Sequence, residues 1–336
     1  MDGPANETPC LRDVYAARKR IRGLAIETPL VPSALSARAG IEILLKLECF
    51  QPVGAFKIRG AANAIATLPD QARARGVTCC STGNHGRAVA FAAKAAGIRA
   101  VVCLSELVPA VKVDAIKALG AEVRRIGRSQ DDAQREVDRL VTEDGMTDVP
   151  PFDHPQVIAG QGTIALELFE ARPDLRTIVV PLSGGGLMAG IALAAKAIAP
   201  RVRMIGVSME RGAAMAESLR AGRPVEVEEV PSLADSLGGG IGLGNRWSFA
   251  LCRDLVDETI LVSEEEIYRG LQCLYRDDRL IAEGGSAVAH AALLAGKLEI
   301  EGPAAFIISG RNVDMAQFSR IVAGEPVTLG GRVVQG

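Results

Sequence analysis

Aromatic residues are scarce in this 336-residue chain, at 4% of its residues, and it has one tryptophan and three histidines. Few aromatic rings leave few platforms on which the bases of single-stranded nucleic acid could stack. Lys and Arg number 38 against 40 Asp and Glu, which gives a net charge of −2. The basic surface that nucleic-acid binding needs is therefore not expected. The histidines lie too far apart in the sequence to suggest a zinc cluster.

Long apolar runs and paired cysteines are also lacking. No apolar run reaches the roughly 20 residues that span a bilayer, and residues 1–22 lack the apolar core of a signal peptide. The seven cysteines form no C-x-x-C pair, and the adjacent Cys79 and Cys80 would point to opposite faces of a strand. We therefore expect a cytoplasmic protein with reduced thiols that binds neither nucleic acid nor a membrane.

Aliphatic residues and 36 glycines dominate instead, which is typical of an α/β enzyme, and the length suggests roughly two domains. Strands alternate with helices, as in a parallel sheet covered by helices. A segment with three prolines, 147–155, separates two such series. We expect a large domain of residues 1–65 and 150–336 and a small domain of residues 66–149. The expected strands are 44–47, 77–81, 99–104, 121–126, 177–182, 202–208, 258–262 and 304–308, and the expected helices are 87–96, 109–119, 129–144, 187–199, 263–276 and 284–294.

The segment SGGGL, residues 183–187, lies between an expected strand and an expected helix. Glycines let the backbone approach an anion closely, and the first turn of a helix offers unpaired N–H groups, so a phosphate is the natural ligand. Gly184, Gly186 and Ala189 also fit G-x-G-x-x-A, with Glu210 just after the next strand. This dinucleotide fingerprint keeps an NAD-dependent oxidoreductase open as an alternative.

Three further segments have side chains suited to a ligand site. Lys57 lies within ECFQPVGAFKIRGA, residues 48–61. A catalytic amine must lose its proton near neutral pH, and a surface lysine is an equally good interpretation. STGNHG, residues 81–86, offers short polar donors suited to a carboxylate, although His85 alone is typical of an ordinary loop histidine. SGRN, residues 309–312, follows the last expected strand, where parallel-sheet proteins bind ligands; a plain β-turn is the alternative.

In this order, these segments resemble the fold-type II pyridoxal-phosphate (PLP) enzymes of the serine/threonine dehydratase and serine racemase group. The resemblance covers nearly the whole chain and rests on PVGAFKIRGA (52–61), STGNHG (81–86), FDHP (152–155), AGQGTIALE (159–167), SGGGL (183–187) and SGRN (309–312). Within the group, the chain is most similar to the hydroxyectoine utilization dehydratase branch through GRSQDDAQ (127–134), MERGAAMA (209–216) and ADSLGGGIG (234–242).

The resemblance implies an α/β fold of the tryptophan synthase β type, with two three-layer parallel-sheet domains, PLP as cofactor and a homodimer. Lys57 would form a Schiff base with PLP and later take the Cα proton, and Thr82 would be the second catalytic residue. The glycine loop would hold the phosphate, Phe56 would pack on the ring, and Ser309 would face the pyridine nitrogen. The implied cofactor-binding residues are Phe56, Lys57, Asn84, Gly184, Gly185, Gly186, Leu187, Glu283 and Ser309, and the implied substrate-binding residues are Ser81, Thr82, Asn84 and His85.

The implied reaction is the dehydration of a β-hydroxy amino acid to a 2-oxo acid and ammonia, with a place in hydroxyectoine catabolism. Alternatives of the same fold are a threonine or serine dehydratase and a serine racemase. A non-catalytic amino-acid-binding protein is a third class beside the oxidoreductase. The substrate is a small molecule in every case.

Four positions depart from the pattern of the group. Thr82 stands where racemases have a catalytic serine, and Gln134 stands roughly where they have a substrate-side arginine. Ser236 replaces a glycine near the ring. Relatives with a divalent-cation site have an aspartate six residues after a glutamate, but here Ala216 follows Glu210. No metal site is therefore predicted.

Overall fold

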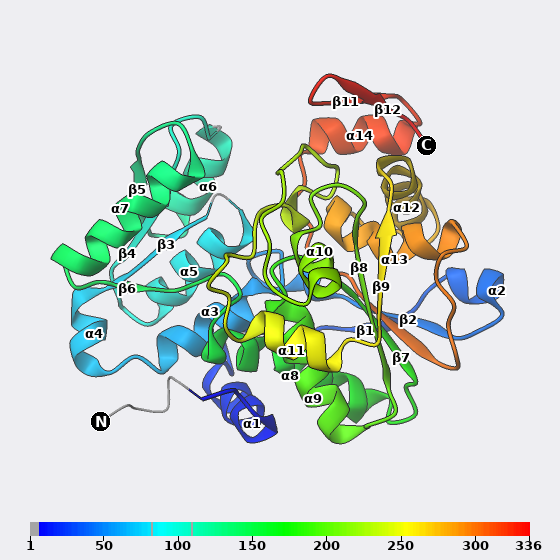
Figure 1. Ribbon diagram of the computed structural model, residues 1–336, viewed down its shortest axis with the longest axis horizontal. Helices are drawn as coiled ribbons and strands as arrows, with labels where there is room; N and C mark the ends of the chain where they lie inside the picture. Colours follow the sequence, from blue (N-terminus) through cyan, green and yellow to red (C-terminus); the bar gives the residue numbers. More distant parts are fainter. Residues whose placement is uncertain (1–6, 82, 109) are drawn as a thin grey trace. The chain divides into compact units, whose positions relative to one another are not determined.

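The computed structural model describes residues 7–81, 83–108 and 110–336. The chain folds into two compact units, one of Met1–Ile26 and Gln51–Gln161 and the other of Glu27–Phe50 and Gly162–Gly336. Figure 1 shows helices and strands throughout both units. Each unit has its own sheet, so each is described by itself.

The first unit is built on a four-stranded parallel sheet in the order β5-β4-β3-β6. Side chains of β3 alternate between the two faces. Cys79 packs in the core shared with α3, α5 and α6, whereas Cys80 packs on the opposite side with residues of α7. The predicted opposite orientation of these two cysteines is therefore confirmed. The elements of this unit are α1 (Leu11–Arg20), α3 (Lys57–Ala66), α4 (Asp70–Arg75), β3 (Val77–Cys80), α5 (Asn84–Ala95), β4 (Ala100–Leu104), α6 (Ala110–Ala118), β5 (Glu122–Arg125), α7 (Gln130–Glu143), β6 (Thr147–Asp148) and the first part of α8 (Pro155–Ala171).

The second unit contains a six-stranded sheet in the order β1-β2-β10-β7-β8-β9. All neighbouring strands are parallel except β1, which runs antiparallel to β2 at the edge. Helices α12, α13 and α14 share one core with these strands. Helix α9 packs against β7, and α11 packs against α9. The elements are β1 (Leu30–Pro32), α2 (Leu35–Ala39), β2 (Ile43–Lys46), η2 (Glu48–Phe50), the rest of α8, β7 (Thr177–Pro181), α9 (Gly186–Ile198), β8 (Arg203–Met209), α10 (Ala214–Ala221), η3 (Asp235–Leu237), α11 (Ser248–Leu255), β9 (Glu258–Val262), α12 (Glu264–Arg276), α13 (Gly284–Leu294), β10 (Ala304–Ile307), α14 (Met315–Ala323), β11 (Val327–Leu329) and β12 (Arg332–Val334).

Helix boundaries follow local capping chemistry. Ser129 precedes α7, and its hydroxyl accepts a hydrogen bond from the Asp132 backbone N–H, while the Asp132 side chain reaches back to the Ser129 N–H. This capping box supplies partners for N–H groups that a helix start leaves unpaired. The predicted Ser129 cap is therefore confirmed.

The division of the chain differs from the expected domains at residues 1–26, 51–65 and 150–161, which belong to the smaller sheet's unit. The reason is packing. Ile58 and Ile65 of α3 share a buried core with Val89 of α5 and with the parallel strands. The antiparallel β1 and the β11–β12 hairpin were also not among the expected elements.

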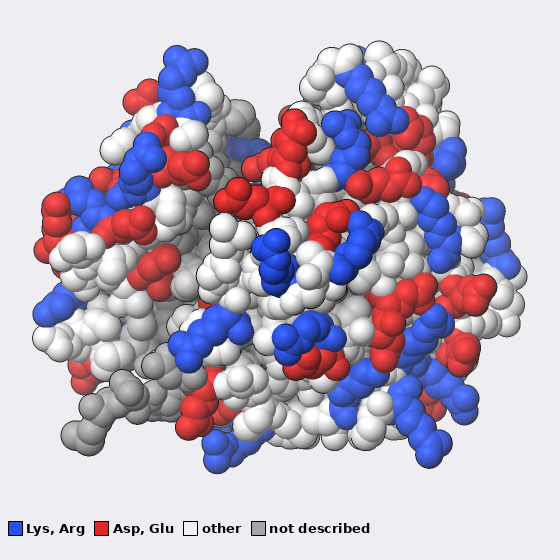
Figure 2. Space-filling model, viewed as in Figure 1, with Lys and Arg blue, Asp and Glu red and all other residues white. Residues whose placement is uncertain are grey.

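The surface carries both signs of charge. Figure 2 shows Lys and Arg interspersed with Asp and Glu over the face in view. Among the described residues, no helix combines the length and apolarity needed to cross a membrane.

Candidate active site

Lys57 is the first residue of α3, in the first unit. Its Nζ donates a hydrogen bond to the backbone oxygen of Pro151, at 2.6 Å, and lies 5.3 Å from the centroid of the Phe56 ring. Lys57 itself is half-buried, whereas Ile58 behind it is fully buried. The amine is therefore held by a rigid, packed helix rather than by a mobile surface segment.

Helix α3 is fixed by an unusually close approach to α8. A Cβ at Gly160 would lie 2.5 Å from the backbone oxygen of Arg59 and 2.7 Å from Cα of Gly60. Asn63, one turn further along α3, donates to the backbone oxygen of Gln156 at 2.7 Å. Because only glycine leaves room for this approach, Gly160 helps to set where Lys57 begins its helix.

The STGNHG segment joins β3 to α5. Asn84 and His85 open the helix, and the Ser81 hydroxyl accepts from the Gly83 N–H at 3.4 Å. Thr82 lies outside the described residues. Nε2 of His85 lies 2.6 Å from the Val149 backbone oxygen, which requires Nε2 to carry the hydrogen. Burial is the main cause that lowers the pKa of His85 to about 3, with a smaller contribution from the nearby Lys57 charge.

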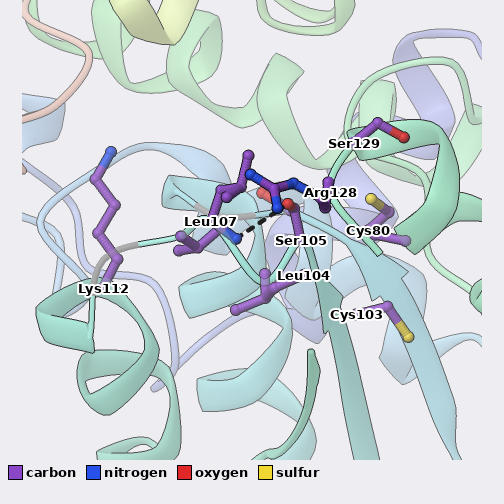
Figure 3. Close-up of a pocket in the computed structure, with 11 residues that line it drawn as sticks. Cys80, Cys103, Leu104, Ser105, Leu107, Lys112, Arg128 and Ser129 are labelled. Atoms are coloured by element: carbon purple, nitrogen blue, oxygen red, sulfur yellow. Dashed lines mark hydrogen bonds between the residues drawn. The ribbon is translucent and has the colours of Figure 1, made fainter. Parts of the chain in front are cut away.

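A pocket of about 290 Å³ lies at the carboxyl edge of this sheet, next to Ser81. Ser81 directly follows β3, and Ser105 directly follows β4. Figure 3 shows Arg128 reaching toward Ser105 from the side opposite Lys112 of α6. The eleven described residues that line this pocket include two cationic side chains and no carboxylate. The pocket is therefore suited to an anionic group.

The glycine loop lies in the second unit, between β7 and α9. Gly185 precedes the helix with φ of +87°, and a Cβ there would come within 2.5 Å of the Met215 methyl group. The Ser248 hydroxyl donates to the Gly184 oxygen at 2.8 Å, and the Cys252 thiol lies 3.6 Å from the Gly185 oxygen. The loop carbonyls are thus occupied by α11, which leaves the N–H groups of the α9 start for an anion.

Ser309 and Glu283 come together in the second unit, although they are distant in sequence. The Glu283 N–H donates to the Gly310 oxygen at 3.1 Å, and a Cβ at Gly310 would lie 2.8 Å from the Glu283 carboxyl carbon. Ser286 of α13 lies 3.0 Å from the Ser309 hydroxyl and also bonds Gly310. All three side chains are buried, so the hydrogen bonds of this cluster are shielded from solvent.

A family model described as "Pyridoxal-phosphate dependent enzyme" matches residues 21–310. This chain belongs to that family. It is 40% identical to the L-threonine ammonia-lyase of Thermotoga maritima, over 96% of this chain and 80% of the relative. It is 37% identical to the L-threo-3-hydroxyaspartate ammonia-lyase of Saccharomyces cerevisiae, over 94% and 97%. The structure of maize serine racemase superposes with a TM-score of 0.88 at 34% identity, covering 94% of this chain and 97% of that one.

These findings confirm the predicted fold-type II PLP enzyme, its α/β fold and its threonine dehydratase-like character. They also replace the dinucleotide interpretation of the glycine loop. Glu210, the acid of that fingerprint, pairs with Lys297 at 3.1 Å. The G-x-G-x-x-A spacing therefore occurs here in the glycine loop of the PLP-dependent family and not in a dinucleotide-binding loop.

The residues present fit PLP. A phosphate needs several converging N–H donors, and the α9 start supplies them because the carbonyls of Gly184 and Gly185 are turned to α11. An aldehyde needs an amine, and Lys57 supplies one at a fixed helix start. A pyridine nitrogen needs a polar partner, and the buried Ser309 hydroxyl is one.

Sequence reasoning missed the groups that hold these residues in place. Pro151, Ser248 and Ser286 contact Lys57, the glycine loop and Ser309 through hydrogen bonds between segments far apart in the chain. The local signal for Ser286 was its place as a small polar residue in GGSA, the first turn of α13. Nothing local marks Pro151 as the acceptor for Lys57.

Proposed function

We propose that this protein is a PLP-dependent ammonia-lyase that converts a β-hydroxy amino acid to a 2-oxo acid and ammonia. The observation that carries this proposal is Lys57, held at the start of a packed helix in a chain that belongs to the PLP-dependent family. Two relatives are named as ammonia-lyases of threonine and of threo-3-hydroxyaspartate, and both substrates are β-hydroxy amino acids.

The protein's own groups divide the work of this reaction. Bound PLP supplies an electron sink for the pair left at Cα. Lys57 would hold PLP covalently, and its Nζ would take the Cα proton of the substrate. Phe56 would pack on the ring, Asn84 would bond the ring 3′-oxygen, and the N–H groups of residues 184–187 would hold the phosphate. The neutral Ser309 hydroxyl would face the pyridine nitrogen, which would favour prompt loss of the β-hydroxyl.

The substrate carboxylate is assigned to the STGNHG segment. Ser81, Asn84 and the N–H groups at the start of α5 are its donors. His85 is neutral at pH 7, and its Nε2 hydrogen is used by Val149, so its ring shapes the loop from behind. Glu283 lies beside Gly310, near the proposed ring position. Thr82 stays a hypothesis as the second catalytic residue.

The pocket beside Ser81 favours a substrate with a second carboxylate. Lys112 and Arg128 line it without a carboxylate among the described lining residues. A hydroxyaspartate-type side chain would place its negative charge there, whereas the methyl group of threonine would gain nothing from the two cations. The motifs shared with the hydroxyectoine utilization branch add hydroxyectoine-derived amino acids to the candidate substrates. We further propose a cytoplasmic homodimer.

The test is a 2-oxo acid release assay with threonine, serine, threo-3-hydroxyaspartate and hydroxyectoine-derived amino acids. We expect turnover of at least one, with a yellow protein that borohydride bleaches. Arg128→Ala should raise KM for hydroxyaspartate and leave KM for threonine unchanged. A colourless protein without 2-oxo acid release on any of the four would overturn the proposal.

Serine racemization is the alternative within the same fold. It needs a proton delivered to the face of Cα opposite Lys57, and Thr82 is the candidate donor. The threonine methyl restricts its rotamers, so we expect pyruvate release from serine to exceed inversion, and Thr82→Ser to increase inversion. Chiral chromatography alongside pyruvate release measures both. Faster inversion than pyruvate release would identify a racemase instead.

A further inference from the structure

Ser286 lies at the centre of a buried hydrogen-bond cluster in the second unit. It belongs to the first turn of α13 and is fully buried. Its Oγ lies 2.8 Å from the Gly310 backbone nitrogen, 2.8 Å from the Gly310 oxygen and 3.0 Å from the Ser309 Oγ. All three of these partner atoms belong to the segment that carries Ser309.

The single hydrogen of Ser286 has two places to go. The Gly310 N–H donates to its oxygen, so the Ser286 hydrogen is directed either to the Gly310 oxygen or to Ser309 Oγ. The Gly310 oxygen already accepts from the Glu283 N–H at 3.1 Å, so it keeps a partner in both arrangements. Either direction of the Ser286 hydrogen therefore leaves the Gly310 oxygen with a hydrogen-bond partner. The direction decides whether Ser309 accepts from Ser286 or donates to it.

When Ser286 donates to Ser309, the chain of hydrogen bonds runs from the Gly310 N–H through Ser286 to Ser309. Ser309 then has its own hydrogen left to donate outward. In the opposite arrangement Ser309 donates to Ser286 and can only accept. Successive hydrogen bonds that run in one direction polarise and strengthen one another.

We propose that Ser286 is a positioning residue that orients the Ser309 hydroxyl as a hydrogen-bond donor to the pyridine nitrogen of PLP. This rests on the proposed function, in which Ser309 faces that nitrogen. Ser286 touches neither substrate nor cofactor and acts through Ser309. Ser286 would keep the pyridine nitrogen unprotonated, because it makes the Ser309 hydroxyl a hydrogen-bond donor toward that nitrogen rather than an acceptor.

A double-mutant cycle between Ser286 and Ser309 tests this. PLP is titrated into apoprotein of wild type, Ser286→Ala, Ser309→Ala and the double variant, and binding is followed by absorbance. Each single substitution should weaken PLP binding about 3- to 10-fold, because each removes one hydrogen bond from the chain. The double variant should bind no more weakly than Ser309→Ala.

A second readout separates positioning from simple packing. Ser286→Ala should change the pH dependence of the bound cofactor's absorbance in wild type but not in the Ser309→Ala background. Ser286→Thr keeps a hydroxyl and should restore the wild-type titration. If Ser286→Ala does not fold, Ser286→Cys takes its place in the test, because its thiol hydrogen-bonds weakly and should give the change expected of the alanine variant. Ser218→Ala is the matched control, since Ser218 is a fully buried serine of α10 that accepts from the Val225 N–H.

The outcomes separate two failures. If the wild type binds PLP and releases 2-oxo acid but the two substitutions are additive, the inference about Ser286 is overturned and the proposed function stands. An unchanged absorbance titration in Ser286→Ala has the same meaning. If wild-type protein neither binds PLP nor releases 2-oxo acid, the proposed function fails and this inference fails with it.

Discussion

The site residues of the two units differ in how completely their polar atoms are paired. In the second unit, hydroxyls from neighbouring helices complete the backbone around the glycine loop and around Ser309: Ser248 bonds Gly184, and Ser286 bonds Gly310. In the first unit, Nδ1 of the buried His85 has no hydrogen-bond partner among the described residues. Lys57 Nζ in the same unit donates a hydrogen bond to the Pro151 backbone oxygen at 2.6 Å.

This difference matches a division of labour. A cofactor cradle has to keep its shape through every turnover, so its hydrogen bonds are made within the protein. A group that takes part in the reaction has to change partners during turnover, and in the first unit the proposed group of this kind is the Lys57 amine. Substitutions in the first unit should therefore affect turnover more than cofactor binding, and those in the second unit the reverse.

The largest effect is expected at Lys57. Lys57→Ala removes both the covalent anchor and the proposed base, so turnover should fall by about 10³-fold or more. Borohydride should no longer fix the cofactor, while thermal unfolding of the apoprotein should change little. Lys117→Ala, an exposed lysine of α6, is the control and should retain activity. Undiminished turnover in Lys57→Ala would assign the chemistry to another lysine.

Gly160 tests whether the α3–α8 approach positions Lys57. The Cβ of Gly160→Ala would meet backbone atoms at 2.5 and 2.7 Å, so one helix must shift. We expect a loss of about 1–3 kcal/mol of stability and at least tenfold lower kcat. Gly244→Ala, where a Cβ would meet nothing within 4 Å, is the control. A kcat equal to wild type would show that the close approach does not position the lysine.

Gly185 is the counterpart in the second unit. Its φ of +87° and the 2.5 Å approach of the Met215 methyl both disfavour a side chain. Gly185→Ala should distort the phosphate cradle and weaken PLP binding about tenfold, since left-handed backbone alone costs about 1–2 kcal/mol for alanine. With saturating PLP, kcat should recover toward wild type. A kcat that stays low at saturation would contradict the division between holding and reacting groups.

Ser309→Asp tests the electronic role of the hydroxyl. A carboxylate facing the pyridine nitrogen would keep it protonated and stabilise the carbanion, so dehydration should slow several-fold and side transamination should rise. Both products are measured by chromatography in the same reaction. The Ser286 hydroxyl, 3.0 Å from the native Ser309 oxygen, would donate to the new carboxylate. An unchanged product ratio would show that Ser309 does not contact the ring.

Local patterns predicted correctly where those segments lie that belong to one strand-loop-helix unit. The glycine loop, the STGNHG loop and the Ser129 cap each lie beside a strand or a helix start, where sequence spacing alone predicts their place. Ser286 and Pro151 could not be predicted, because their roles arise from contacts between segments that only tertiary packing brings together. The same holds for the division of the chain, which depends on α3 packing with α5 rather than on any local signal.

The smallest effect is expected from the titration of His85. Its pKa is lowered to about 3 by burial and by Lys57, against an ordinary value of 6.5. Above pH 6.5 both folded and unfolded chains hold it neutral, so it contributes nothing. As pH falls below 6.5, the unfolded chain takes up a proton that the folded chain refuses, and stability drops by up to about 1.4 kcal/mol per pH unit.

His85→Gln keeps a donor for Val149 but cannot titrate. Its free energy of unfolding should therefore fall less than that of wild type between pH 7 and pH 5, by about 2 kcal/mol, in urea unfolding at several pH values. Asp148→Asn is the matched comparison within the same unit. Burial, the main cause, raises the pKa of Asp148 to about 6, so the folded chain binds its proton before the unfolded chain does. Acidification from pH 7 to 4 then stabilises the fold through Asp148, and Asp148→Asn should remove that gain. The two variants should shift the pH dependence in opposite directions, and parallel profiles for His85→Gln and wild type would show that the ring is not held neutral in the folded protein.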